Sequence, residues 1–98
     1  MTKAYLVGQI TITNPVAYAT YAGQVPQTIE AFGGKYLVRG GHSTQLEGQP
    51  QGERQVVVEF PNRETAEAWY HSHAYQAILS HRTNNSIGTI AIVDGYDT

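Results

Sequence analysis

Two kinds of hydrophobic pattern alternate along the chain. Runs rich in β-branched and aromatic residues predict strands, and apolar stripes at helical spacing predict helices. Residues 4–12 are rich in β-branched and aromatic residues, which is typical of a strand. Asn14-Pro15 predicts a helix start, because Asn can accept from free amide groups and Pro lacks only a donor that is unpaired there anyway. Gly33-Gly34 ends this helix, since glycine adopts the left-handed cap at little steric cost. The helical stripe between these signals consists of Tyr18, Ala22, Val25 and Ile29.

The rest of the chain predicts three more strands and one more helix. Asn62 caps the second helix, which is expected to break near His71-Ser72 and to carry its apolar stripe on to Arg82. The strands are predicted at residues 35–41, 55–60 and 86–93, with a polar connection over residues 40–54. The order β-α-β-β-α-β is that of a ferredoxin-like α+β fold, with a four-stranded antiparallel sheet and two helices on one face. At 98 residues, the chain is expected to form a single domain over residues 1–98.

The first and last strands carry apolar residues on both of their faces. In the first strand, Tyr5 and Val7 point to one face, and Leu6 and Ile10 point to the other. The last strand likewise has apolar residues on both faces. Two helices cover only one face of a four-stranded sheet, and a face in water should be polar. An apolar open face would exceed the patch that monomeric proteins tolerate. We therefore expect a homodimer that packs sheet against sheet around a two-fold axis. The alternative is that sheet twist and the long loop shield part of this face.

Composition and charge exclude several classes of function. Six basic against eight acidic residues give a net charge of −2, and no basic stripe indicates nucleic acid as a partner. The absence of cysteine excludes disulfides, thiolate metal sites and a cysteine nucleophile. No apolar run approaches the roughly 20 residues needed to span a bilayer, and the N-terminus lacks the pattern of a signal peptide. We therefore expect no membrane partner and a cytoplasmic location.

Polar groups interrupt the apolar stripe of the second helix, which is more typical of a lined cavity than of a plain core. The candidates for ligand contacts in this segment are Trp69, Tyr70, Ser72, Tyr75 and Arg82. Their hydroxyls and guanidinium suit an anionic or phenolic ligand. The alternative is structural: Trp69 belongs to the core, Ser72 caps a helical turn, and the tyrosines bond backbone groups. In that case Arg82 lies along the core and neutralises a helix end.

Arg39 lies on a predicted strand whose neighbours of the same parity include Leu37, so it extends from a partly apolar surface. The planar fork of its guanidinium matches a carboxylate or phosphate, and Arg39 is therefore a candidate anchor for an acidic ligand. Glu47, in the loop that follows, is a further candidate. The alternative is an ion pair of Arg39 with Glu47 or Glu59 that ties the loop down.

The four histidines do not form a metal-binding or haem-binding pattern. His42 lies in the loop, His71 and His73 diverge if both are helical, and His81 follows on the second helix. A metal site needs three or four converging ligands with a supporting shell, and no spacing here supplies them. We therefore expect no metal and no cofactor. A serine hydrolase is disfavoured as well, because no G-x-S-x-G sequence occurs.

Short motifs spread over almost the whole chain resemble one sequence family, the domain-of-unknown-function 1330 family (DUF1330). The residues that carry this resemblance are Gly33-Gly34, Leu37 to Gly41, Glu47-Gly48, Glu59 to Pro61, Ala66, Ala68 to Tyr70, Ser72, Tyr75-Gln76, Arg82 and Asp94-Gly95. The family is similar to the dimeric α+β barrel superfamily, which implies a ferredoxin-like subunit whose sheet pairs with that of its twin. The chain departs from the family pattern at His73, where proline is commoner, and at Asn84-Asn85, which replace smaller residues.

Relatives in the wider superfamily include cofactor-independent monooxygenases, lactone isomerases and haem-dependent enzymes, while the family itself carries no established reaction. Two functions therefore stand side by side. One is a small-molecule-binding protein, or a cofactor-independent enzyme of the monooxygenase or isomerase kind, that takes a small organic acid or phenol between sheet and helices. Arg39 would anchor the acidic group of that ligand. The other is a non-catalytic homodimeric binding or scaffolding module.

Overall fold

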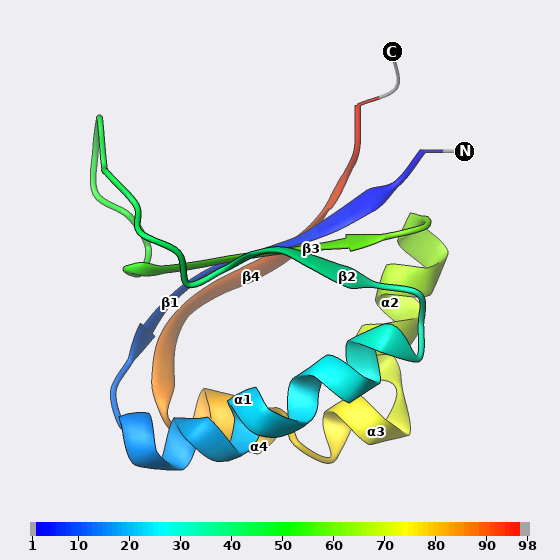
Figure 1. Cartoon of the computed structure of the whole chain (residues 1–98), viewed down its shortest axis with the longest axis horizontal. Coiled ribbons are helices and arrows are strands. Elements are labelled where there is room, and N and C mark those ends of the chain that lie inside the picture. Colours follow the sequence, from blue (N-terminus) through cyan, green and yellow to red (C-terminus); the bar gives the residue numbers. More distant parts are fainter. Residues whose placement is uncertain (1, 97–98) are drawn as a thin grey trace.

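The computed structural model describes residues 2–96, and it shows a four-stranded sheet with helices on one face (Figure 1). In chain order the elements are β1 (Ala4–Ile12), α1 (Pro15–Glu30), β2 (Lys35–Arg39), β3 (Arg54–Phe60), α2 (Arg63–His71), α3 (His73–Gln76), α4 (Leu79–Thr83) and β4 (Ser86–Asp94). The helices lie below the sheet in the view of Figure 1, while the connection between β2 and β3 rises on the opposite side.

The sheet has the strand order β2-β3-β1-β4, and each neighbouring pair is antiparallel. β1 is therefore a central strand, and its Tyr5 pairs with Glu59 on one side and with Val93 on the other. A register shift between Tyr36 and Val38 interrupts the pairing of β2 with β3. This topology confirms the predicted α+β, ferredoxin-like fold.

The helix signals read from the sequence are present in the structure. Asn14 Oδ1 accepts from the amide of Ala17 at 3.2 Å, and Asn62 Oδ1 accepts from the amide of Thr65 at 2.8 Å. These bonds satisfy donors that every helix start leaves unpaired. After α1, the chain passes through Gly33 with a φ of 74°, a left-handed conformation that glycine adopts without strain. Local sequence thus fixes where both helical segments begin and where α1 ends.

Several boundaries differ from the prediction. β2 ends at Arg39 and not at Gly41, and β4 extends to Asp94. β3 begins at Arg54, one residue earlier than expected, so Arg54 shares a face with Val56 and Val58. The second helix is divided twice and not once: Ser72 turns to extended backbone and caps α3, as predicted, and a second interruption at Ile78 separates α4. The side chain of Ile78 is buried in the core, so its packing outweighs the weak preference of these residues for a continuous helix.

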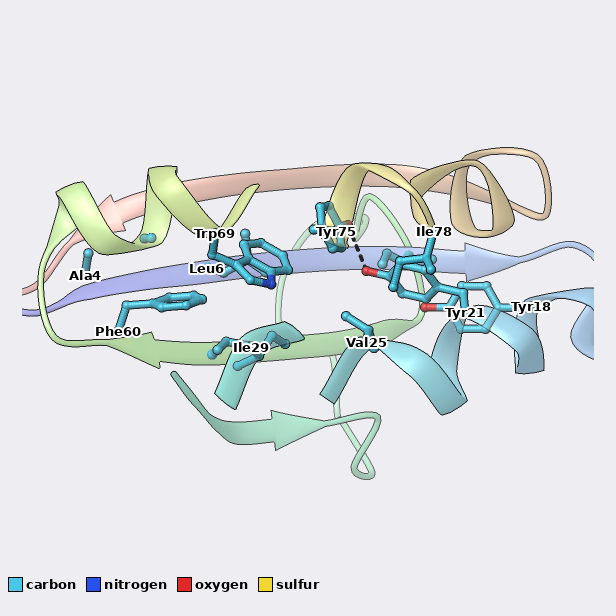
Figure 2. Packing of buried hydrophobic residues seen from close by; sticks show 13 residues of the cluster. Ala4, Leu6, Tyr18, Tyr21, Val25, Ile29, Phe60, Trp69, Tyr75 and Ile78 are labelled. Atoms are coloured by element: carbon cyan, nitrogen blue, oxygen red, sulfur yellow. Dashed lines mark hydrogen bonds between the residues drawn. The ribbon is translucent and has the colours of Figure 1, made fainter. Parts of the chain in front are cut away.

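The hydrophobic core lies between the helices and the sheet face that they cover, which we call the covered face. Its largest fully buried side chains are Trp69, Tyr75, Phe60, Ile29 and Val58. The rings of Trp69 and Tyr75 lie 4.1 Å apart, and those of Trp69 and Phe60 lie 5.5 Å apart (Figure 2). These ring contacts hold α2 and α3 against the sheet.

The other sheet face, which we call the open face, carries rows of side chains, of which one at the end of the sheet pairs Thr11 with Ile87. The central row is apolar and runs across all four strands: Val38, Val57, Val7 and Ala91. One flanking row is Lys35, Glu59, Tyr5 and Val93, and the other is Gln55, Gln9 and Thr89. Val38 and Val93 remain 39% and 48% exposed, so the described residues leave this face partly uncovered. β1 is therefore apolar on both faces, as the sequence indicates.

Candidate functional site

A cavity of about 30 Å³ lies between the covered face and α1. A volume of this size holds about two water molecules. Its lining comes from all four strands, from α1 and from α2. The lining residues are Leu6, Gly8, Ile10, Tyr18, Tyr21, Ala22, Val25, Ile29, Tyr36, Arg39, Arg54, Val56, Val58, Trp69 and Ile90. Most of this wall is apolar, and its polar side-chain atoms belong to three tyrosines, two arginines and the indole of Trp69.

Gly8, at the middle of β1, gives the cavity part of its space. Gly8 lies on the covered face with Leu6 and Ile10, but it has no side chain to fill the layer between sheet and helix. A Cβ atom at this position would lie 3.6 Å from Ile90 and 3.8 Å from Val56, which are ordinary contact distances. Gly8 also has no positive φ, so neither crowding nor backbone conformation requires glycine here, and its effect is to keep space open.

Arg39 closes one side of the cavity. It lies at the end of β2, and its Nη2 donates to the carbonyl oxygen of Ala22 on α1 at 2.7 Å. Its guanidinium also stacks over the ring of Tyr36, 4.7 Å from the centroid. Arg39 thus links the edge of the sheet to α1. Neither Glu47 nor Glu59 pairs with it among the described residues, so the alternative of an ion pair that ties down the loop is wrong.

Arg54 lies beside the cavity at the start of β3, and one of its donors has no acceptor. Its Nε is buried and has no hydrogen-bond partner among the described residues. A buried donor without an acceptor is costly, because it loses its bonds to water. Gly40 makes room for this guanidinium: its φ is 70°, and a side chain there would collide with Arg54. The neighbouring backbone thus accommodates Arg54 in this position.

The acidic residues that form ion pairs do so away from the cavity. Glu59 contacts Lys3 at 3.3 Å and Lys35 at 3.6 Å, both on the side of the open face. On the outside of α2, Arg63 pairs with Asp94 at 2.7 Å and with Glu67 at 3.1 Å. No carboxylate and no histidine belongs to the cavity lining among residues 2–96. The lining therefore presents cationic and hydroxyl donors without a matching anion.

Three tyrosines, Tyr18, Tyr21 and Tyr36, belong to the lining as well. Tyr18 and Tyr36 have no hydrogen-bond partner for their hydroxyls within the described part of the chain. Burial raises the pKa of Tyr36, and Arg39 and Arg54 oppose that rise only in part. Tyr36 therefore remains a neutral phenol that can donate. Tyr21 is different, because its hydroxyl lies 2.8 Å from that of Tyr75 (Figure 2).

Arg82 lies behind this tyrosine pair. Its Nε donates to the Tyr75 hydroxyl at 3.3 Å, and its guanidinium lies 6.0 Å from the ring centroid of Tyr21. Burial alone would lower the pKa of Arg82, but its interactions with Tyr75 and Tyr21 outweigh that effect and raise the pKa. Arg82 and Tyr75 were predicted as ligand contacts. The structure places them next to the lining and not in it.

The remaining candidates of the second helical segment have structural partners. Trp69 lines the cavity, and its indole N–H donates to Thr28 Oγ1 at 2.9 Å. Ser72 accepts from the amide of Tyr75 at 3.2 Å and donates to the carbonyl of Trp69 at 2.7 Å, so it caps α3 as the structural alternative foresees. Tyr70 packs its ring against Trp69 and faces the β4 side, outside the cavity.

Glu47 and the four histidines lie away from the cavity. Glu47 is exposed in the loop between β2 and β3, where its carbonyl accepts from Gln45. His42, His71, His73 and His81 are absent from the lining as described for residues 2–96. No group of three or more histidines, cysteines or acids among these residues is placed to hold a metal. Within the same range, no helix is both long and apolar enough to cross a membrane.

Sequence reasoning missed Arg54, Tyr18, Tyr21 and Tyr36 as site residues. Arg54 was assigned to the loop because the strand was expected to begin one residue later. With the strand extended by one position, the two-residue period would have placed Arg54 on the buried face with Val56 and Val58. Tyr21 was missed because its hydroxyl partner, Tyr75, is 54 positions away.

Comparisons with known proteins support the fold. The family model described as "Domain of unknown function (DUF1330)" matches residues 3–96. No curated protein matches the chain. The crystal structure of a protein of unknown function from Rhodopseudomonas palustris is 15% identical, with a TM-score of 0.77 over 99% of this chain and 83% of that chain. SnoaB, a cofactor-independent oxygenase from Streptomyces nogalater, is 8% identical, with a TM-score of 0.63 over 100% and 97% of the two chains.

A further similar structure is that of an antibiotic biosynthesis monooxygenase. It is 11% identical, with a TM-score of 0.56 over 100% of this chain and 99% of that chain. At such low identities the likeness shows a shared fold, and function has to be argued from the site.

Proposed function

The chain belongs to the DUF1330 family, and from this premise we propose that it binds a small organic anion in the cavity between the covered face and α1. The carboxylate of the ligand contacts Arg54 and Arg39, and its apolar part contacts the aliphatic and aromatic lining. Trp69, at the inner wall, belongs to that apolar part of the site. The predicted role of Arg39 as an anchor is kept, with Arg54 as a second cation beside it.

The observation that carries this proposal is the buried Nε of Arg54, which has no acceptor among the described residues. A carboxylate would supply that acceptor and would also balance the charge, because no acid lies in the lining. Charge-assisted bonds of arginine to carboxylate are about twice as strong as neutral hydrogen bonds. The site therefore favours an anion over a neutral molecule of the same shape.

Cavity size limits the ligand. The present space holds about two water molecules, so an acid as small as acetate already needs the lining to move apart slightly. A larger acid or a phenol would first have to separate Arg39 from the carbonyl of Ala22, since that bond bridges sheet and helix beside the cavity. Small carboxylates are accordingly the probes with which binding should be sought first.

An enzymatic role without a cofactor extends the same proposal. SnoaB is described as a cofactor-independent oxygenase and has a similar fold, and this extension rests on that fold-level analogy alone. The lining offers tyrosines and arginines but no histidine or carboxylate as a general base. A substrate would therefore have to ionise readily by itself, with the arginines stabilising its negative charge.

The test is an NMR titration that follows the indole N–H signal of Trp69, the one tryptophan of the sequence. Acetate and propionate are compared with acetamide and propionamide, which have similar shapes but no charge. We expect the acids to bind at least about tenfold more tightly than the amides, because a buried charged pair is worth more than a neutral bond. Arg54→Met should abolish this preference. Arg63→Met, which removes an arginine outside the cavity, should leave it intact.

Gly8→Ala provides a second variant that does not depend on charge. Its methyl group fits at ordinary contact distances, so the fold should persist while the cavity becomes smaller. Propionate binding should weaken more than acetate binding. Equal binding of acids and amides to the wild-type protein would overturn the proposal, and so would acid binding that persists unchanged in Arg54→Met.

A second candidate function is favoured by the open face, namely that of a homodimeric module in which a second copy of this chain covers the central valine row. The row Val38, Val57, Val7 and Ala91 is apolar across the sheet. Burying such a face against its own copy removes apolar surface from water and satisfies two-fold symmetry. The connection between β2 and β3 rises on the same side and would flank the second copy (Figure 1).

Sedimentation of two lysine variants tests this assembly. Val57→Lys places a charge at the middle of the open face and should convert a dimer into a monomer, because a buried lysine would lie close to its symmetry mate. Val16→Lys is the matched control, since Val16 is 85% exposed on α1, away from the sheet. A wild-type protein that sediments as a monomer at high micromolar concentration would refute the dimer.

A further inference from the structure

Three polar groups form a hydrogen-bonded chain that ends at the cavity. Arg82 Nε donates to the hydroxyl of Tyr75 at 3.3 Å, and the hydroxyls of Tyr75 and Tyr21 lie 2.8 Å apart. Tyr21 belongs to the cavity lining, whereas Tyr75 and Arg82 lie behind it. Figure 2 shows the bond between the two tyrosines at the point where α1 and α3 face each other.

The direction of this chain follows from the donors and acceptors that each group has. Arginine can only donate, so the oxygen of Tyr75 accepts from Arg82. If Tyr21 also donated to Tyr75, the hydrogen of Tyr75 would be left without an acceptor among the described residues. Tyr75 is fully buried, so an unpaired donor there would be costly. The favourable arrangement has Tyr75 donating to Tyr21.

This direction leaves the hydrogen of Tyr21 without a partner inside the described part of the chain. Tyr21 is 7% exposed and lines the cavity, so this hydrogen is available to whatever occupies the space. Burial raises the pKa of Tyr21, and the neighbouring Tyr75 raises it further. The Tyr21 phenol therefore keeps its hydrogen at neutral pH. Its oxygen accepts from Tyr75, and its hydrogen can be donated to a ligand.

Surrounding contacts hold the hydrogen-bonded groups in place. The ring of Tyr75 packs 4.1 Å from that of Trp69, and its backbone amide is fixed by Ser72. The rings of Tyr18 and Tyr21 lie 5.5 Å apart. A donor that is held by rigid packing and by hydrogen bonds from neighbouring groups discriminates between ligands better than a mobile one.

We infer that Tyr21 is a specificity-determining residue that donates to a second oxygen atom of the ligand, so that the cavity prefers 2-oxo acids to simple monocarboxylates. The inference rests on the proposed function, because it assumes a carboxylate at Arg54 and Arg39. In a 2-oxo acid, the carbonyl oxygen adjacent to the carboxylate accepts from Tyr21. A monocarboxylate of the same size leaves the Tyr21 hydrogen unpaired or bound to water. Tyr75 and Arg82 are positioning residues, because they fix which atom of Tyr21 donates.

Pyruvate and propionate provide a matched pair of probes, since both have three carbons and one carboxylate and differ at the second carbon. Their dissociation constants are measured by NMR titration of the Trp69 indole signal. For the wild-type protein we expect pyruvate to bind about tenfold more tightly than propionate. In Tyr21→Phe the two constants should become equal while that of propionate changes little.

Two further variants separate positioning from simple structural damage. Tyr75→Phe keeps the Tyr21 hydroxyl but removes the donor that directs it, so the preference for pyruvate should fall to an intermediate value. Tyr70→Phe, in which the lost hydroxyl lies outside the cavity, should keep the full preference. The ratio of the two constants is informative even if overall affinity falls, because general loosening weakens both acids alike.

The failure of the inference and the failure of the proposed function give different results. If both acids bind the wild-type protein equally, or if Tyr21→Phe retains the preference for pyruvate, Tyr21 does not select the ligand although the anion site stands. If neither acid binds the wild-type protein, the anion site and the role of Tyr21 are both refuted.

Discussion

The two faces of the sheet differ in whether their charged side chains form ion pairs. On the open face, Lys3 and Lys35 share the carboxylate of Glu59. On the covered face, Arg39 and Arg54 lie beside an apolar cavity without any acid, and one donor of Arg54 is unpaired within the described residues. The charges of the open face are thus paired with one another, whereas the two guanidinium groups of the covered face, of which that of Arg39 is exposed, have no acidic partner in the cavity lining.

This difference indicates what each face lacks. The open face has satisfied ions but uncovered valines, so it lacks apolar contact, which a second protein surface can provide. The covered face has abundant apolar contact but unpaired donors, so it lacks acceptors, which a small anion can provide. Two different partners are therefore expected at the two faces, and single substitutions can test each side of the comparison.

Adjacent valines on β3 give the largest expected difference between the faces. Val58 is fully buried on the covered face, whereas Val57 is half-buried on the open face. Val58→Ala should lower the free energy of unfolding by about 2 kcal/mol, through lost burial and the cavity left behind. Val57→Ala should lower it by less than about 1 kcal/mol, because its methyl groups are partly in water. Urea denaturation at low protein concentration measures both values.

Protein concentration sharpens this comparison. If a second copy covers the open face, the cost of Val57→Ala should rise with concentration while that of Val58→Ala stays constant. If the cost of Val57→Ala does not change with protein concentration, the open face is not covered by a second copy, contrary to the proposed dimer.

The two kinds of arginine give the next largest effect. Arg54→Met removes an unpaired buried donor and keeps most of the side-chain volume, so the ligand-free protein should become more stable by about 1 kcal/mol. Arg63→Met should destabilise it, because Arg63 is bonded to Asp94, Glu67 and the carbonyl of Ile92. Thermal unfolding without added anions checks the two signs. Loss of stability in Arg54→Met would mean that its guanidinium is satisfied in the folded protein.

Acid titration of Glu59 gives the smallest effect. Burial alone would raise the pKa of Glu59, but Lys3, Lys35 and the hydrogen bond from Tyr5 outweigh it and lower the pKa. A carboxylate with a lowered pKa in the folded state stabilises it above the ordinary pKa of glutamate. That contribution is lost as the pH falls through the folded-state value. The difference in stability between wild type and Glu59→Gln should thus be present at neutral pH and be lost as the pH falls through the lowered folded-state pKa of Glu59.

Urea denaturation of both proteins across this pH range provides the measurement, and added salt should reduce the difference at neutral pH. A difference that is independent of pH would indicate that Glu59 acts through packing and not through its charge.

Much of the fold could be predicted because its signals are local. Asn14 and Asn62 occur immediately before the helices that they cap, and Gly33 follows α1 directly. Ser72 interrupts the second helical segment where the sequence predicts it. Apolar residues at both odd and even positions of β1 also indicated correctly that both faces of this strand carry apolar side chains.

The candidate site was less predictable because its geometry depends on residues far apart in sequence. A shift of one residue in the start of β3 decided whether Arg54 belonged to a loop or to the cavity. The pairing of Tyr21 with Tyr75 joins α1 to α3, and no sequence period connects them. The second interruption, at Ile78, depends on its burial in the assembled core and has no local breaker residue.

The position of β1 in the sheet has a consequence for synthesis on the ribosome. β1 pairs only with β3 and β4, and β2 pairs only with β3, so neither early strand has its neighbours until later residues emerge. In nascent chains that end before Phe60, the apolar strand β1 is therefore unpaired, and α1 lacks the complete sheet against which it packs. Native structure should thus arise only near the end of translation.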